Sequence, residues 1–213
     1  MSKARILLAD DHRIVIEGLK KLLEPEYDVV GTVEDGRALI AAVAELQPDV
    51  VVADISMPHL NGIEAVRQIK EKSPRIKVVM LTMHHDAQSA VRAFEAGASG
   101  FVLKASASNE LITAIGEAMR GKTYVTPLIA GDLIQSYREG KANPEIGLRQ
   151  LSARQREILQ LVAEGRSAKE IGRALNISAR TVESHKYQIM EALNVKTSAE
   201  LVQFAIKHGI ISI

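Results

Sequence analysis

Short apolar segments rich in β-branched residues alternate with longer, helix-like segments through the first 122 residues of the chain. The apolar runs predict five strands, at 5–9, 28–33, 50–53, 77–81 and 100–103. The intervening stretches predict five helices, at 14–23, 38–46, 62–72, 87–97 and 110–121. This alternation indicates an α/β fold, in which a doubly wound parallel sheet is covered by helices on both faces.

Polar residues directly follow four of these predicted strands. They are Asp10, Asp11, Asp54, Thr82 and Lys104. In an open parallel sheet the carboxyl ends of the strands meet at one edge, and ligands bind there. We therefore expect three carboxylates, a hydroxyl and an ammonium group in one small pocket.

Three carboxylates in one pocket need compensation. At about 4 Å and an effective dielectric constant near 20, each like-charge pair costs about 4 kcal/mol. A hard divalent cation with oxygen ligands relieves this repulsion, so Mg²⁺ is the expected metal. With Mg²⁺ and Lys104 the formal charges balance, and the pocket tolerates a phosphoryl group. Asp10 and Asp11 are adjacent and suited to metal binding, whereas Asp54 stands alone and is the predicted nucleophile.

Composition and charge indicate two modules. Residues 1–122 hold 15 basic and 17 acidic side chains, whereas residues 151–213 hold 9 basic and 6 acidic ones. Residues 123–148 read as a linker with a short helix at 127–137. Its turn signals are Gly140, Asn143, Pro144 and Gly147.

The chain has no cysteine, which excludes disulfides and thiolate zinc sites. No apolar stretch approaches the roughly 18–20 residues of a membrane span, and we expect a cytoplasmic protein.

The last segment, residues 149–213, is marked by helix-start patterns. Ser152, Ser167 and Thr197 are each followed three residues later by Gln or Glu, the pattern of a capping box. Together with an N-cap at Ser178, they predict four helices, near 153–164, 168–175, 179–193 and 198–208. Their expected C-terminal stops are Gly165, Asn176, Asn194 and Gly209. The three-residue turn at 176–178 is typical of a helix-turn-helix.

The third of these helices has the pattern of a major-groove reader. Helical spacing directs Val182, Ile189 and Leu193 inward, with His185 near their edge. The same spacing directs outward Arg180, Glu183, Ser184 and Tyr187. The candidate contacts to the DNA backbone are Lys169, Arg180, Lys186 and Lys196. On the last helix, Val202 and Ile206 form a second apolar stripe, which predicts a two-fold dimer contact and inverted half-sites in the DNA.

Four motifs of the first module carry a resemblance to a known family. They are DD (10–11), DISMP (54–58), LTM (81–83) and GFVLK (100–104), which resemble the receiver domain of bacterial response regulators. The C-terminal segment is similar to the LuxR-type helix-turn-helix. The order of the two segments and the linker match the NarL/FixJ family, and the resemblance covers nearly the whole chain.

The resemblance implies a flavodoxin-like, five-stranded receiver followed by an all-α, four-helix DNA-binding domain. It implies that Asp54 accepts phosphate from a sensor histidine kinase. The implied Mg²⁺ ligands are Asp10, Asp11, Asp54 and the backbone carbonyl of Ser56. Thr82 and Phe101 match the switch pair of the family, and Lys104 matches its phosphate partner. The implied DNA contacts of the recognition helix include Thr181, Glu183, Ser184 and Tyr187.

Two other classes of function remain open at this point. A Mg²⁺-dependent aspartyl phosphohydrolase also uses Asp, Thr and Lys at strand ends, but it usually carries an Asp-x-Asp motif after the first strand. Residues 9–13 read Ala-Asp-Asp-His-Arg instead. A protein-binding module with a helical tail is the third class.

The expected function is that of a transcriptional regulator without enzymatic activity. It binds double-stranded DNA, has no membrane partner, and forms a homodimer when phosphorylated or DNA-bound. His12 is expected to begin the first helix, and His185 to support packing or a phosphate.

Overall fold

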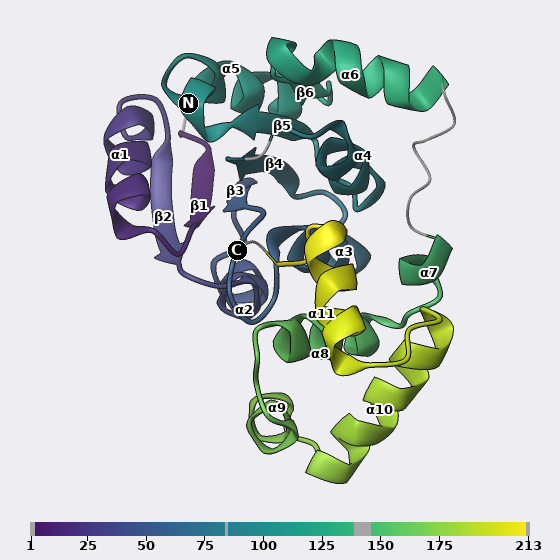
Figure 1. Cartoon of the computed structure of the whole chain (residues 1–213). Coiled ribbons are helices and arrows are strands. Elements are labelled where there is room, and N and C mark those ends of the chain that lie inside the picture. Colours follow the sequence, from purple (N-terminus) through teal and green to yellow (C-terminus); the bar gives the residue numbers. More distant parts are fainter. Residues whose placement is uncertain (1–2, 84, 139–145, 212–213) are drawn as a thin grey trace. The chain divides into compact units, whose positions relative to one another are not determined.

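The structure is a computed structural model that describes residues 3–83, 85–138 and 146–211. The chain divides into two compact units, residues 1–142 and 143–213 (Figure 1). The turn signals at Gly140, Asn143 and Pro144 lie outside the described residues. Across the described ranges, no helix is both long enough and apolar enough to cross a bilayer.

The first unit is built on a parallel sheet whose strand order is β2-β1-β3-β4-β5-β6. The strands are β1 (Arg5–Ala9), β2 (Asp28–Val33), β3 (Val50–Asp54), β4 (Lys77–Thr82), β5 (Gly100–Leu103) and β6 (Tyr124–Val125). The predicted α/β class with a doubly wound parallel sheet is confirmed. The predicted number of five strands is wrong, because the two-residue strand β6 extends the edge beside β5.

Helices cover both faces of this sheet (Figure 1). On one face lie α1 (Arg13–Leu23) and α5 (Ala107–Met119), and on the other lie α2 (Gly36–Leu46), α3 (Gly62–Lys72) and α4 (Ala87–Glu95). Alternate residues of β1 serve the two layers: Leu7 packs in the α2–α4 core, whereas Ile6 and Leu8 pack in the α1–α5 core. Both faces of the central strands are therefore buried, which explains their continuous apolar sequence.

The part of the chain from the end of α5 through residue 138 belongs to the first unit. Residues 123–148, the predicted linker, contain β6 and the helix α6 (Pro127–Arg138). Thr126, between these elements, is fully buried. Its amide donates to the Phe101 carbonyl at 3.0 Å, and its hydroxyl accepts from the Leu103 amide at 3.1 Å and donates to Glu110 at 2.7 Å. These bonds attach the start of α6 to the end of β5.

The second unit is all-helical. Its helices are α7 (Ile146–Arg149), α8 (Ala153–Ala163), α9 (Ala168–Leu175), α10 (Ala179–Ala192) and α11 (Ser198–Lys207). The four predicted helices are confirmed to within one residue, and α7 is an additional short turn. The four predicted stop residues all have positive φ.

Local capping explains where the helices of the second unit begin. Ser152 and Ser167 form complete capping boxes with Gln155 and Glu170. Thr197 caps α11, but the Glu200 carboxylate accepts from the Lys196 amide at 2.8 Å. The return hydrogen bond of the capping box predicted at Thr197 therefore comes from the amide of Lys196 and not from that of Thr197. The helices enclose a core that includes Ile158, Leu161, Ile171, Val182, Ile189 and Leu201.

Candidate functional site

The parallel sheet brings the predicted polar residues to one edge. Asp54 and Thr82 are the last residues of β3 and β4, while Asp10 and Lys104 directly follow β1 and β5. The register pairs Asp54 with Leu81 and Thr82 with Leu103, so the ends of the central strands are level. Residues up to 94 positions apart in the sequence therefore share one pocket.

Lys104 joins the two buried carboxylates of this pocket. Its Nζ lies 2.7 Å from Asp10 Oδ2 and 2.8 Å from Asp54 Oδ2. The side chains are almost inaccessible, with 9% of Lys104, 0% of Asp10 and 4% of Asp54 exposed. Asp10 Oδ1 accepts a hydrogen bond from the His12 amide at 2.9 Å. The pocket thus holds a buried ion triad, a kind of arrangement that costs desolvation energy and is common at functional sites.

Burial and charge act in opposite directions on the titration of these groups. Burial raises the pKa of Asp54 above its ordinary value; the hydrogen bond from Lys104 and its charge only partly offset this, as does the Ser56 backbone hydrogen bond. Burial lowers the pKa of Lys104, but hydrogen bonds to Asp10 and Asp54 outweigh this and raise it overall. The lysine is therefore held as a cation, while the Asp54 carboxylate is less stable than a solvated one.

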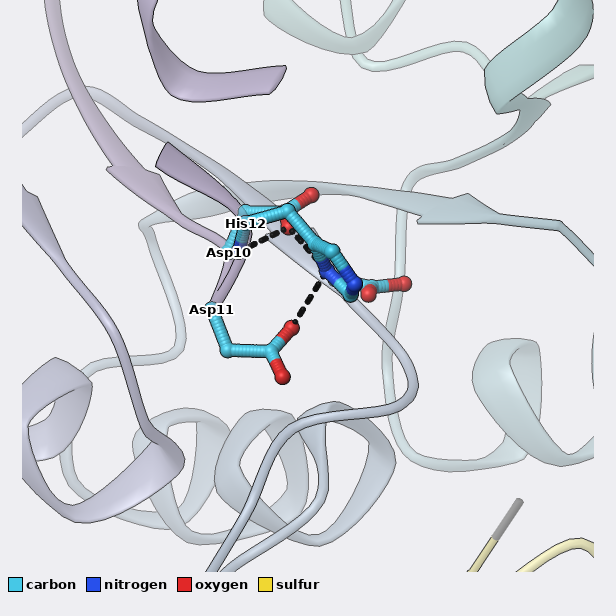
Figure 2. A group of neighbouring side chains, drawn as sticks. Asp10, Asp11 and His12 are labelled. Carbon is cyan, nitrogen blue, oxygen red and sulfur yellow. Dashed lines mark hydrogen bonds and ion pairs between the residues drawn. The ribbon is translucent and has the colours of Figure 1, made fainter. Parts of the chain in front are cut away.

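The pocket contains a donor set that can hold a metal ion. One ligand atom from each of Asp10, Asp11, His12 and Asp54 lies within 4.8 Å of the others. Figure 2 shows the His12 ring turned toward the carboxylates of Asp10 and Asp11. Carboxylate oxygens suit a hard divalent cation, so the chemistry of the donors fits the expected metal. Asp11 is more exposed than Asp10, with 33% of its side chain accessible.

The loop after β3 is held close to Asp54. The Gly62 amide donates to the Ile55 carbonyl at 2.9 Å. A Cβ atom added to Gly62 would lie 2.0 Å from the Asp54 carbonyl oxygen, so only glycine fits there. Asn61 caps α3 by accepting from the Glu64 amide at 2.9 Å. Sequence reasoning did not identify Gly62; the glycine at the start of the 62–72 helix was its only signal.

The predicted switch residues Thr82 and Phe101 are both buried, with 1% and 0% exposed. The Phe101 ring packs against Phe94 of α4, with ring centroids 6.5 Å apart. The Phe101 ring therefore lies in the core of the first unit in this structure. The switch role itself stays a prediction.

In the second unit, α9, a tight turn and α10 form the helix-turn-helix. Asn176 ends α9 in the left-handed conformation at φ 54°, and Ser178 caps α10. A Cβ atom on Gly172 would approach the Ile177 carbonyl oxygen to 2.7 Å, so α9 and the turn are in close contact at a glycine. The helix-turn-helix predicted from the spacing is confirmed.

The α10 helix divides into a buried face and an exposed one. Val182 and Ile189 are buried, and Leu193 is half-buried. The predicted DNA-contact residues on the exposed face are Arg180, Thr181, Glu183, Ser184 and Tyr187, whereas Lys186 is half-buried. The Thr181 hydroxyl lies 2.8 Å from that of Ser178, within the helix cap. The exposed residues form a polar surface on the second helix of the helix-turn-helix, the helix that lies in the major groove in proteins with this motif.

The remaining predicted contacts lie outside α10. Lys169 on α9 and Lys196 after α10 are exposed, as backbone contacts require. Val202 and Ile206 of α11 were expected to be exposed, but both are half-buried. Their role in a dimer contact stays a prediction. The two side chains expose less apolar surface than the helical pattern suggested.

Two histidines have surroundings that the sequence did not reveal. His12 was expected only to begin α1, yet its ring joins the acidic group (Figure 2). His185 of α10 keeps Nδ1 buried without a hydrogen-bond partner among the described residues. A lone histidine next to two aspartates was the available signal for His12, and nothing in the sequence separated it from an ordinary helix start.

Comparisons with known proteins agree with both units. The response regulator receiver domain matches residues 6–116, and the luxR family of bacterial regulatory proteins matches residues 149–205. The transcriptional regulatory protein DegU of Brevibacillus brevis is 35% identical, with 98% of this chain and 95% of DegU covered. The oxygen regulatory protein NreC of Staphylococcus carnosus is 36% identical, with 95% and 97% covered.

A solved structure extends the likeness to the whole chain. RcsB of Salmonella enterica serovar Typhimurium, bound to promoter P1flhDC in the presence of the phosphomimetic BeF3-, matches with a TM-score of 0.62. It is 29% identical, and the match covers 95% of this chain and 98% of RcsB. The chain therefore belongs to the NarL/FixJ family of response regulators, which are DNA-binding transcriptional regulators that join a receiver domain to a LuxR-type helix-turn-helix domain.

Proposed function

We propose that Asp54 accepts a phosphoryl group from a sensor histidine kinase and that this modification promotes DNA binding by a homodimer. The observation that carries the proposal is the buried Lys104 ammonium, which lies 2.8 Å from Asp54 Oδ2. It supplies a fixed positive charge where the phosphoryl oxygens arrive, and a preorganised charge of this kind is the main source of catalysis in phosphoryl transfer.

The transfer is a displacement at phosphorus. An Asp54 carboxylate oxygen forms the new oxygen–phosphorus bond while the nitrogen–phosphorus bond of the kinase phosphohistidine breaks. The bonding electron pair stays on the imidazole nitrogen of the kinase. Asp10, which pairs with Lys104 and accepts from the His12 amide, is assigned to metal binding and not to the new bond.

The residues that would hold Mg²⁺ are Asp10, Asp11, Asp54 and the Ser56 carbonyl. The three carboxylates supply the hard oxygen ligands that this ion prefers, and their side chains are within reach of one another. When bound, Mg²⁺ supplies positive charge that neutralises phosphoryl oxygens. Lys104, which directly follows β5, contributes a further positive charge, so the pocket accepts the added charge of the phosphoryl group.

The modified carboxylate would redirect Lys104 and Thr82. The Lys104 ammonium exchanges an aspartate oxygen for a phosphoryl oxygen, and the Thr82 hydroxyl donates a hydrogen bond to another. One charge-assisted hydrogen bond is worth about 1.5–3 kcal/mol, whereas moving a two-state population from 1:99 to 99:1 needs about 5.5 kcal/mol. Thr82 alone falls short, so Lys104 and the dimer contacts supply the remainder.

On DNA, the exposed face of α10 would enter the major groove. Glu183, Ser184 and Tyr187 reach base edges, and the basic residues around them contact phosphates. Three or four phosphate contacts give moderate affinity for one subunit, which favours two subunits on inverted half-sites. We place the dimer contact at Val202 and Ile206 of α11, and the protein in the cytoplasm, where its DNA target lies.

Intact-protein mass spectrometry after incubation with acetyl phosphate and Mg²⁺ tests the chemical step. The full chain is expected to gain the mass of one phosphoryl group, and Asp54→Asn is expected to gain none. Asp35→Asn is the matched control, because Asp35 caps α2 through its side chain and asparagine keeps that cap.

DNA capture completes the test. Genomic fragments bound with the phosphodonor are expected to be enriched over those bound without it, and the enrichment should disappear in Asp54→Asn. An unchanged mass in the wild type, or equal labelling of Asp54→Asn, would overturn the proposal. Enrichment that survives in Asp54→Asn would show that DNA binding is not controlled through Asp54.

A further inference from the structure

His12 does not do what a residue at its position usually does. It is the N-cap residue of α1, but its side chain makes no capping hydrogen bond. The imidazole instead turns back toward the pocket (Figure 2), where Nδ1 lies 2.8 Å from Asp11 Oδ1 and 3.3 Å from Asp10 Oδ1. The ring is thus aimed at the oxygens that would hold the metal.

The position of Nδ1 fits a metal ligand. It belongs to the four-atom group within 4.8 Å that also includes atoms of Asp10, Asp11 and Asp54. Metal–ligand bonds of about 2.1 Å place donors on opposite sides of an ion about 4.2 Å apart. A small contraction of this group therefore brings one nitrogen and three oxygens to bonding distance of a single ion.

We propose that His12 is a nitrogen ligand of this pocket and gives it a preference for a divalent first-row transition ion, such as Mn²⁺, over Mg²⁺. Imidazole is a good ligand for transition ions, whereas Mg²⁺ prefers oxygen. The ring binds through the lone pair of Nδ1, and its remaining N–H stays toward water, because 63% of the side chain is exposed. The inference rests on the proposed function, since it assumes that the pocket holds a metal.

The competing explanation is that His12 only orients Asp11. A histidine that hydrogen-bonds to a ligand carboxylate changes metal affinity without contacting the ion. Such a positioning role affects Mn²⁺ and Mg²⁺ alike and leaves no bond between nitrogen and metal. The two explanations therefore differ in a spectroscopic signature and in the ratio of the two affinities.

Pulsed electron paramagnetic resonance of the full chain loaded with Mn²⁺ tests the bond directly. Wild type is expected to show electron spin echo modulation from a directly bound nitrogen, and His12→Ala is expected to lose it. His59→Asn is the matched control. His59 pairs with Asp35 at 3.6 Å on the loop after β3 and has positive φ, which asparagine tolerates.

Titration calorimetry gives the second readout. His12→Ala is expected to weaken Mn²⁺ binding about tenfold, the scale on which the surroundings of a metal affect affinity, and to weaken Mg²⁺ binding much less. Thermal unfolding without metal checks that the variant is folded, and His12→Gln serves in its place if it is not.

The outcomes separate this inference from the proposed function. Mn²⁺ binding without nitrogen modulation, or an equal loss of affinity for both ions, would overturn the role of His12 and leave the Mg²⁺ pocket intact. If wild type bound neither ion, the metal part of the proposed function would fall together with the inference.

Discussion

The acidic pocket buries its functional groups, whereas α10 presents its functional groups to solvent. The side chains of Asp10, Asp54 and Lys104 are at most 9% exposed, whereas Tyr187 on the recognition helix is 71% exposed. Losing one member of a buried ion group leaves a desolvated charge, while exposed substitutions change stability little. Substitutions of the pocket residues are therefore expected to change the stability of the first unit, whereas substitutions on the exposed face of α10 should leave the stability of the second unit nearly unchanged.

The largest expected effect is the loss of the lysine charge in the pocket. Lys104→Met keeps the aliphatic stem but leaves the Asp10 and Asp54 carboxylates facing each other. We expect the first unit to lose about 3 kcal/mol of stability without metal. Urea denaturation of the full chain, followed by hydrogen exchange in peptides from β1 and β3, measures this.

Lys122→Met is the matched control for that prediction. Lys122 pairs with Glu117 at 3.2 Å, but 66% of its side chain is exposed, so its loss should change stability by at most about 1 kcal/mol. Equal effects of the two substitutions would show that the pocket charges are not strongly coupled to the fold.

The next effect concerns packing in the second unit. Gly172→Ala forces a Cβ atom against the Ile177 carbonyl oxygen, and we expect a loss of about 2 kcal/mol, typical of overpacking. Gly18→Ala in α1 makes the same chemical change where no other atom lies within 4 Å, and should stabilise by about 0.5–1 kcal/mol. Calorimetry of both variants decides this; a neutral Gly172→Ala would mean that the turn can move.

A smaller effect, a gain of stability instead of a loss, is expected from substituting Asp54, the proposed phosphoacceptor. Because burial raises the pKa of Asp54 above 3.8, the folded state binds protons more tightly than the unfolded one. The Asp54 contribution to stability is therefore lost as pH rises through the raised pKa. Asp54→Asn should stabilise the metal-free protein at pH 7 by about 1 kcal/mol, a typical single-substitution effect.

The pH dependence provides the check on that prediction. The stability difference between Asp54→Asn and wild type should shrink as pH falls through the raised pKa and be smallest below 3.8, where both states of wild type are protonated. Denaturant titrations at a series of pH values measure it. A difference that stayed constant with pH would assign the effect to packing instead of charge.

The smallest effect on stability is expected on the recognition helix. Tyr187→Ala should change the free energy of unfolding by less than about 0.5 kcal/mol, because the ring is exposed. Loss of its proposed base contact should cost about 1–3 kcal/mol of discrimination between DNA sequences. Fluorescence anisotropy with a selected DNA site and a scrambled one measures this discrimination. If Tyr187→Ala failed to fold, the expected separation of DNA binding from stability in the second unit would be wrong.

The sequence predicted the pocket and the helix-turn-helix for different physical reasons. Asp10, Asp54 and Lys104 were brought together by one rule, that parallel strands end at the same edge of a sheet. Helix boundaries in the second unit followed from Ser152, Ser167 and other caps, which act within one turn of the chain. Both features could be predicted from the sequence because neither depends on how side chains far apart in the sequence pack against each other.

The features that sequence reasoning missed depend on tertiary neighbours. Strand β6 has only two residues, and it exists because Gly100 and Phe101 of β5 pair with it. The inward position of Phe101 and the half-burial of Val202 depend on packing that no local pattern encodes. The reach of His12 into the acidic group depends on a rotamer, and the sequence carries no record of it.

Thr126 links the end of β5, which directly precedes Lys104, to the start of α6. Two of its three hydrogen bonds join Phe101 and Leu103 of β5 to the residue that precedes α6, and the third reaches Glu110 of α5. Because Lys104 directly follows β5, a displacement of Lys104 that moves the end of β5 is expected to reach the start of α6 through these bonds of Thr126.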